Sequence, residues 1–106
     1  MHDFRSDNVA GAAPQVMTAL AAAATGTASP YGNDPWTARV TERLCAIFET
    51  DVAVFPVATG TAANSLALSA LVPPFGAVLC HEDAHITIDE CGAPEFFTGG
   101  AKINPL

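Results

Sequence analysis

The polar stretch CHEDAHITIDEC, residues 80–91, carries the side chains of this sequence that are best suited to chemistry. Histidine, cysteine and aspartate are natural metal ligands, but the spacing here matches neither an HExxH helix nor a cysteine pair. Carboxylates in such a stretch more often form a solvated loop, so we predict no metal site at His81, Asp83, His85 and Cys91. His85 follows an apolar run, and its imidazole is a candidate for ring stacking or proton transfer.

The turn Thr59-Gly60-Thr61, within VFPVATGTAANSLAL at residues 54–68, is the second candidate. A strand that passes through a small-residue turn into a helix presents free backbone N–H groups at the positive end of the helix dipole. This arrangement favours an anion, most often phosphate, and threonine hydroxyls add further donors. The turn lacks the Gly-Lys of nucleoside-triphosphate loops and the three spaced glycines of dinucleotide sites. A capped helix that binds nothing is therefore the alternative.

The helices and strands that must position these residues can be predicted from the spacing of apolar residues and from Pro and Gly, which interrupt regular structure. Helices are predicted at 14–24, 35–49 and 62–71, and short strands at 52–57, 77–80 and 101–104. Asp34 is the expected N-cap of the second helix, whose apolar stripe of Trp36, Val40, Leu44, Ile47 and Phe48 indicates core packing. Helices that alternate with short apolar strands favour an α/β fold class.

Composition narrows the function classes. The chain has 106 residues, half of them apolar and only 14% charged, against roughly 25% charged in an ordinary soluble domain. We therefore expect partner subunits or other parts of a larger protein to cover much of the surface. A net charge of −7 with four basic residues argues against nucleic acid. Three unpaired-looking cysteines and the absence of a signal peptide or an apolar span predict a cytoplasmic protein without membrane contact.

Whole blocks of the sequence resemble the N-terminal part of the low-specificity L-threonine aldolases, in the β-eliminating lyase and threonine aldolase family. These are pyridoxal-phosphate enzymes of fold type I, the aspartate-aminotransferase-like fold. The matching blocks stand in the family's order across nearly the whole chain: FRSDN (4–8), YGNDPWTARV (31–40), FETD (48–51), TGTAANSLALS (59–69) and AHITIDECGAPEFF (84–97).

The resemblance implies the N-terminal portion of a three-layer, α/β large domain of the pyridoxal-phosphate-dependent transferase type. Residues 1–13 would form an extended N-terminal arm and residues 14–106 part of the cofactor-binding domain. The rest of that domain and the smaller C-terminal domain would then be absent from the chain. The resemblance further implies a homo-oligomer, a dimer or a tetramer built as a dimer of dimers.

The resemblance also implies the site residues. Thr59, Gly60 and Thr61 would bind the phosphate of pyridoxal 5'-phosphate. His85 would stack on the pyridine ring and is a candidate for removing the proton of the substrate's β-hydroxyl group. The implied reaction, in amino-acid metabolism, is cleavage of L-threonine, L-allo-threonine and related β-hydroxy-α-amino acids to glycine and an aldehyde.

The resemblance also implies two residues that would lie close to the substrate. Ser6 would contact the substrate carboxylate, and Tyr31 lies in a loop that runs close to the site in this family. The family's Schiff-base lysine falls downstream of the matching region, and Lys102, the lysine of GGAKINPL, occupies a position that the family does not use for it. We therefore expect a fragment that is inactive by itself. A β-eliminating lyase of the same fold, or a truncated subunit that acts as a non-catalytic interaction module, is the alternative.

Overall fold

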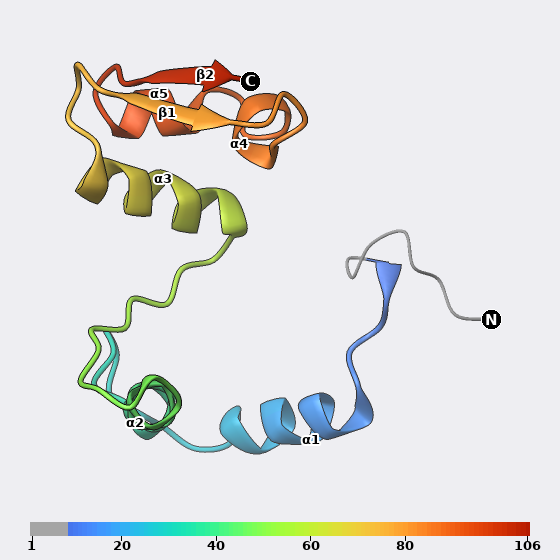
Figure 1. Ribbon diagram of the computed structural model, residues 1–106. Coiled ribbons are helices and arrows are strands. Elements are labelled where there is room, and N and C mark those ends of the chain that lie inside the picture. Colours follow the sequence, from blue (N-terminus) through green and yellow to red (C-terminus); the bar gives the residue numbers. More distant parts are fainter. Residues whose placement is uncertain (1–8) are drawn as a thin grey trace. The chain divides into compact units, whose positions relative to one another are not determined.

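The computed structural model describes residues 9–106, so Ser6 and the rest of the FRSDN block lie outside the described residues. The chain divides into two compact units, of which the first ends at Val54 and the second spans Phe55–Leu106. The first unit holds two helices, α1 (Pro14–Ala23) and α2 (Pro35–Phe48). The second holds α3 (Gly60–Leu71), β1 (Ala77–Cys80), α4 (His85–Ile88), α5 (Ala93–Phe97) and β2 (Lys102–Pro105), as labelled in Figure 1. The predicted division into an arm and one partial domain stays a prediction.

Local signals explain both helices of the first unit. Each begins at a proline, which has no backbone N–H to satisfy and whose fixed φ suits the first turn. Asp34 caps α2 as predicted, because its carboxylate accepts from the backbone N–H groups of Trp36 at 3.0 Å and Thr37 at 2.8 Å. The helix ends at Phe48, and its C-cap, Glu49, takes the left-handed conformation with φ 54° that often terminates helices.

The apolar stripe of α2 is not buried in this structure, and the expectation of core packing is wrong here. Ile47 is 71% exposed and Phe48 63% exposed, and Trp36 and Val40 are also exposed. Amphipathic periodicity predicts which face of a helix is apolar, but burial needs a second element to cover that face. Within residues 9–54 the other helix, α1, makes no extensive contact with α2.

The predicted strand at residues 52–57 does not form. The segment contains no regular secondary structure, and Phe55 within it is 82% exposed. A β-strand exists only through the hydrogen bonds of a ladder, and no strand pairs with this segment among residues 9–106. A β-branched composition indicates a preference for extended backbone, but it does not by itself form a strand.

The second unit is built on a small parallel sheet. β1 and β2 pair in the register Ala77↔Lys102 to Cys80↔Pro105, which confirms the strand predicted at 77–80 and shifts the one predicted at 101–104 by one residue. Parallel strands need a crossover connection, and α4 and α5 supply it. α3 packs against α5, and α4 lies against β2. The prediction of an α/β class holds at the coarse level of mixed helices with a parallel sheet.

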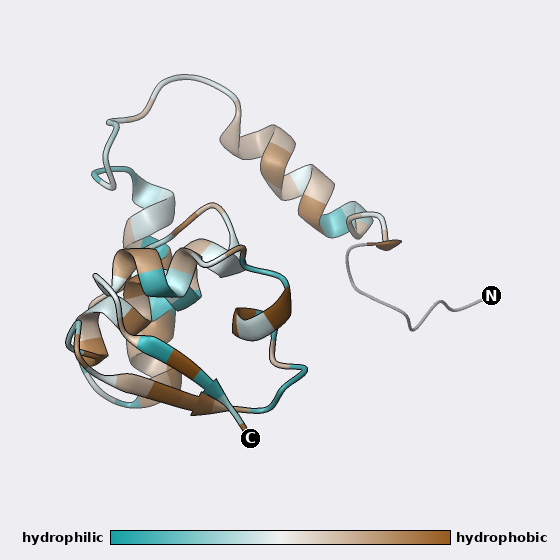
Figure 2. Cartoon of the chain, turned by 90° about the horizontal axis from the view of Figure 1, so that it is seen from above, coloured by the Kyte–Doolittle hydropathy of each residue, from teal (hydrophilic) through white to brown (hydrophobic). Residues whose placement is uncertain are grey.

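Little apolar surface is buried in the described residues. Ala101, at 1% exposure, is the one buried apolar side chain of residues 9–106 apart from the ring of Pro94. Hydrophobic segments recur along the helices and strands of both units (Figure 2). None of the helices in residues 9–106 combines the length and hydropathy needed to cross a membrane.

Candidate functional site

The predicted phosphate turn forms the N-terminal end of α3. Thr59 is the N-cap, and its Oγ1 accepts a hydrogen bond from the Ala62 N–H at 3.1 Å while its carbonyl oxygen accepts from Ala63 at 3.1 Å. These bonds leave the N–H groups of Gly60 and Thr61, which find no acceptor among residues 9–106. The hydroxyl of Thr59 uses its oxygen for capping, so its proton is free to be donated.

This turn fits a phosphate group. A Cβ built on Gly60 would meet no atom within 4 Å, so the backbone there is open to a ligand. Thr59 and Gly60 are exposed and Thr61 is half-buried. Backbone N–H groups, hydroxyl donors and the positive end of the α3 dipole are the groups that hold phosphate at helix N-termini. The donor set therefore suits the phosphate of pyridoxal phosphate.

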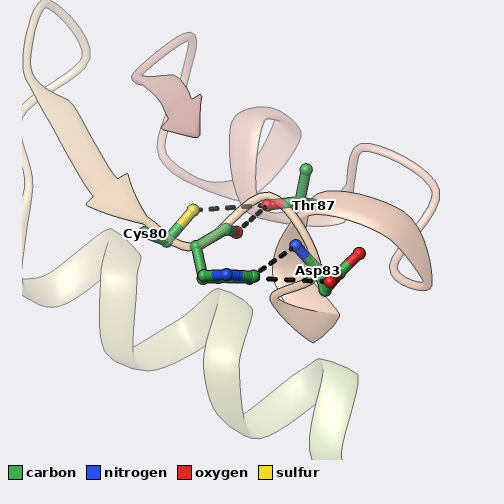
Figure 3. Close-up of polar contacts among 4 residues, drawn as sticks. Cys80, Asp83 and Thr87 are labelled. Carbon is green, nitrogen blue, oxygen red and sulfur yellow. Dashed lines mark hydrogen bonds and ion pairs between the residues drawn. The ribbon is translucent and has the colours of Figure 1, made fainter. Parts of the chain in front are cut away.

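A tight polar turn follows the carboxyl end of β1 (Figure 3). The backbone N–H of Asp83 donates to Nδ1 of His81 at 3.0 Å, and Oδ2 of Asp83 lies 3.8 Å from the same nitrogen. Oγ1 of Thr87, in α4, lies 3.3 Å from Sγ of Cys80 and donates to the carbonyl oxygen of His81 at 3.5 Å. These contacts tie α4 to the end of β1 and so place His85, the first residue of α4.

His85 is joined to a buried carboxylate. Its Nδ1 lies 2.8 Å from Oε1 of Glu90, and the same oxygen accepts from Nδ2 of Asn64 at 2.6 Å. The Glu90 side chain is 0% exposed, whereas 62% of the His85 side chain is exposed. Asn64 belongs to the second turn of α3, so the three side chains link α3 to α4. One ring nitrogen of His85 is thus held by the interior of the unit while most of the ring remains accessible.

The phosphate turn and His85 lie at the same end of the second unit. Asn64 stands five residues after Thr59, which corresponds to about 7.5 Å along a helix axis, and it connects to His85 through Glu90. Both views show α4 beside the N-terminal end of α3 (Figures 1 and 2). In parallel α/β sheets ligands bind outside the carboxyl ends of the strands, next to helix N-termini. The structure thus links α3, whose first turn begins at Thr59, to His85 through Asn64 and Glu90. The roles of Thr59, Gly60, Thr61 and His85 stay predictions.

A sharp reversal of the chain accompanies the buried position of Glu90. The N–H of Ala93 donates to the Glu90 carbonyl oxygen at 2.9 Å, and both central residues of this turn, Cys91 and Gly92, have positive φ of 51° and 75°. Two central residues with positive φ are typical of a type I′ turn. Cysteine pays a steric penalty in this conformation that glycine does not. α5 then begins at Ala93 and packs on α3.

Sequence reasoning missed Asn64 and Glu90. It treated the acidic residues of 81–91 as a solvated loop, which is wrong for Glu90 because its side chain is fully buried. A signal was present in the sequence. Asparagine is a weak helix former, yet Asn64 interrupts an alanine- and leucine-rich helix, and Glu90 follows His85 by five residues in a chain with few charges.

Neither of the two residues carried over for the substrate belongs to the second unit, which holds this cluster. Ser6 lies outside the described residues. Tyr31 belongs to the first unit, where it is 97% exposed and has a φ of 61°. A positive φ is uncommon for a residue other than glycine, and such strain concentrates at functional sites. The proposed role of Tyr31 stays a prediction.

Both described histidines already use a ring nitrogen within the protein. Nδ1 of His81 accepts from the Asp83 backbone, and Nδ1 of His85 is bonded to Glu90. No three side chains of the His, Cys, Asp and Glu types are grouped as a metal site in residues 9–106. The absence of a metal site in the whole chain stays a prediction.

Comparison with known proteins gives the same family for nearly the whole chain. A family model described as beta-eliminating lyase matches residues 3–106. The low specificity L-threonine aldolase of Pseudomonas aeruginosa is 50% identical over 100 residues, which cover 94% of this chain and 29% of that enzyme. The low specificity L-threonine aldolase of Pseudomonas sp. strain NCIMB 10558 is 49% identical over 100 residues, with the same coverage of 94% and 29%. The chain thus spans less than a third of the length of these relatives.

Proposed function

Since the chain belongs to the β-eliminating lyase family, we propose that it forms the cofactor-phosphate and ring-stacking part of a pyridoxal-phosphate-dependent aldolase. The proposed reaction is cleavage of L-threonine, L-allo-threonine and related β-hydroxy-α-amino acids to glycine and an aldehyde. The identity of 50% to an enzyme described as a low specificity L-threonine aldolase supports this substrate class. Because the chain covers 29% of that enzyme, the activity is proposed for the whole protein. In it, these residues would form the N-terminal portion of a three-layer large domain.

The observation that carries the proposal is the open N-terminus of α3 next to an accessible histidine. Gly60 and Thr61 offer backbone N–H groups without an acceptor in the described residues, and the hydroxyl of Thr59 keeps a proton to donate. We propose that these groups bind the phosphate of the cofactor. Pyridoxal phosphate held there supplies the electron sink for cleavage of a bond at the amino acid's α-carbon.

His85 has two proposed tasks. Its side chain is 62% exposed, so a face of the imidazole is accessible for stacking on the pyridine ring. The ring also offers a nitrogen that can accept the proton of the substrate's β-hydroxyl group. Ser6 and Tyr31 are proposed to contact the amino-acid substrate, Ser6 through the carboxylate.

Replacement of His85 tests this proposal in the whole protein. We expect His85→Ala to weaken retention of pyridoxal phosphate and to slow glycine release from L-threonine by roughly 10²-fold, because stacking and proton transfer are both lost. Cofactor retention is measured by absorbance after dialysis and glycine by amino-acid analysis. His81→Ala is the matched control, because the His81 ring contacts only Asp83 through hydrogen bonds or ion pairs in the described chain, and the substitution keeps the backbone carbonyl that Thr87 bonds. Normal turnover and normal cofactor retention in His85→Ala would reject the assignment.

The family description favours β-elimination as a second candidate. L-serine separates the two reactions, because aldol cleavage yields glycine and formaldehyde whereas β-elimination yields pyruvate and ammonia. Glycine as the product supports the aldolase, and pyruvate supports the lyase. β-Elimination of L-threonine would give 2-oxobutanoate and ammonia. If neither glycine nor an oxo acid forms from L-serine or L-threonine with cofactor present, the non-catalytic interaction module is the remaining alternative.

We also propose that the protein is a cytoplasmic homo-oligomer, a dimer or a dimer of dimers. Two observations support this proposal. Cys45, Cys80 and Cys91 are free thiols in the structure, as in a reducing compartment. Large apolar side chains are exposed on both units, where partner subunits would cover them. The mass of the whole protein in solution, measured by light scattering, decides the number of subunits.

A further inference from the structure

Glu90 is the most completely buried acidic side chain of the described residues. Glutamate is almost never fully buried unless it is paired, and here the exposed fraction of its side chain is 0%. Oε1 bonds both His85 and Asn64, at 2.8 Å and 2.6 Å, and Oε2 has no partner among residues 9–106. A buried carboxylate is costly to desolvate, so its position beside the candidate histidine needs an explanation.

The contact fixes which nitrogen of His85 carries a proton. An ionised carboxylate can only accept hydrogen bonds. With Glu90 ionised, Nδ1 of His85 is the donor, and Nδ2 of Asn64 donates to the same oxygen. In the neutral ring the other nitrogen, Nε2, then holds the free lone pair. Nε2 has no protein partner among residues 9–106.

His81 has the opposite arrangement and serves as an internal reference. The backbone N–H of Asp83 donates to Nδ1 of His81 at 3.0 Å, so Nδ1 is the acceptor there. The proton of the neutral His81 ring is then on Nε2. Two histidines four residues apart are thus held as different tautomers by their immediate neighbours.

We propose that Glu90, itself held by Asn64, is a positioning residue that locks His85 in the Nδ1–H tautomer and makes Nε2 its proton-accepting atom. What Nε2 accepts rests on the proposed function, whereas the tautomer follows from the described contacts with Glu90 ionised. The proton of the substrate's β-hydroxyl group goes to Nε2, and Glu90 balances the positive charge that the ring acquires. The anchor also fixes the ring plane, which stacking requires. In the catalytic triads of hydrolases a carboxylate likewise orients a histidine, and the histidine transfers the proton.

The tautomers are measured directly by solid-state NMR of protein labelled with ¹⁵N in the histidine rings. Sedimented protein in alkaline buffer is used without cofactor or substrate, so that self-association does not affect the spectra. Protonated and unprotonated ring nitrogens differ strongly in ¹⁵N chemical shift. We expect a protonated Nδ1 in His85 and a protonated Nε2 in His81, with signals assigned by His85→Gln, His81→Gln and His2→Gln. A proton on Nε2 of His85 in the unmodified protein overturns the proposal.

Glu90→Gln tests the cause. Glutamine has the same size but can donate as well as accept, so we expect His85 to become a mixture of both tautomers. Glu95→Gln is the matched control, because Glu95 also has a buried Oε2 in this unit, and that oxygen has no hydrogen-bond partner among residues 9–106. It should change neither ring, and His81 should be unchanged in both variants. Glu90→Gln protein with unchanged His81 signals and an unchanged His85 tautomer would refute a role for Glu90. If Glu90→Gln does not fold, the tautomer of the unmodified protein still decides.

A kinetic readout connects the tautomer to the reaction. In the whole protein we expect Glu90→Gln to lower kcat for threonine cleavage by roughly 10²-fold, a loss typical of disabled acid–base catalysis, with little change in KM. A fall in stability without a fall in kcat would mean that Glu90 only supports the fold. If the tautomers are as proposed but no threonine is cleaved by the unmodified whole protein, the proposed function fails while the positioning of His85 stands.

Discussion

Two residues at the start of α3, Thr59 and Gly60, have different roles. Thr59 builds the helix, because its hydroxyl and carbonyl oxygens satisfy two of the first N–H groups. Gly60 does not serve the helix in this way. Its φ is not positive, and a Cβ there would meet no atom of the described chain within 4 Å. Close approach of a ligand to the backbone explains a glycine at this position better than the fold does.

Gly60→Ala therefore separates ligand binding from stability. We expect the free energy of unfolding to change by no more than about 1 kcal/mol, and in the favourable direction, because alanine is the better helix former. In the whole protein the added methyl group should weaken pyridoxal phosphate binding by at least about tenfold, or roughly 1.4 kcal/mol. Urea unfolding and cofactor titration by absorbance measure the two effects. Thr59→Ser, which keeps the capping hydroxyl, should alter neither, and unchanged cofactor affinity in Gly60→Ala would contradict the phosphate assignment.

Elements with complete local signals were predictable from the sequence, and the others were not. α2 has an N-cap, a first-turn proline and regular periodicity, so its start at Pro35 was predicted correctly. α4 and α5 have four and five residues, too few to show a helical period. The segment 52–57 needs a partner strand that its own residues do not encode. The buried Glu90 bonds Asn64, 26 residues away. The sequence marks each of the two residues as unusual for its segment, but it does not indicate that they pair.

The N-cap of α2 makes this helix sensitive to acid. Hydrogen bonds from Thr37, and also from Trp36, lower the pKa of Asp34 below its ordinary value of 3.8. The stabilisation is therefore complete above pH 3.8 and is lost as the pH falls through the lowered pKa of the folded state. Trp36, the one tryptophan of the chain, reports the transition by fluorescence. Asparagine caps as well as aspartate but does not titrate, so Asp34→Asn should abolish this pH dependence, and its persistence would assign the transition to another group.

The turn that follows Glu90 is a second element open to test. Cys91 has a φ of 51°, a conformation that costs non-glycine residues roughly 1–2 kcal/mol. Cys91→Gly should raise the free energy of unfolding by up to about 1 kcal/mol, and β-branched Cys91→Val should lower it by about 1–2 kcal/mol. Urea unfolding followed by circular dichroism measures both. Equal effects of the two substitutions would show that the positive φ does not persist in solution.

At the scale of the whole molecule, the sequence has a high apolar content but the structure buries few apolar side chains among the described residues. Half of the residues are apolar, yet large side chains remain in contact with solvent on both units. Phe55 is 82% exposed, Phe75 92% and Phe96 79%. Phe55 and Val57 also line an apolar groove with Leu66 of α3. Monomeric proteins rarely leave contiguous apolar patches of this kind open to water. Apolar faces therefore lie exposed in the described residues, and association is the physical consequence.

We accordingly predict that the 106-residue chain self-associates in water. Its molar mass by light scattering should exceed the 10.9 kDa of one chain and should rise with protein concentration, because burial of apolar area stabilises contacts by about 25 cal/mol per Å². The double substitution Phe55→Asp and Phe75→Asp should lower the mass toward that of a monomer. Ser29→Asp with Ser69→Asp adds the same charge at exposed polar positions, and it should leave the mass unchanged if apolar contact rather than charge drives association. A concentration-independent monomer of the unmodified chain would show that these faces are compatible with water.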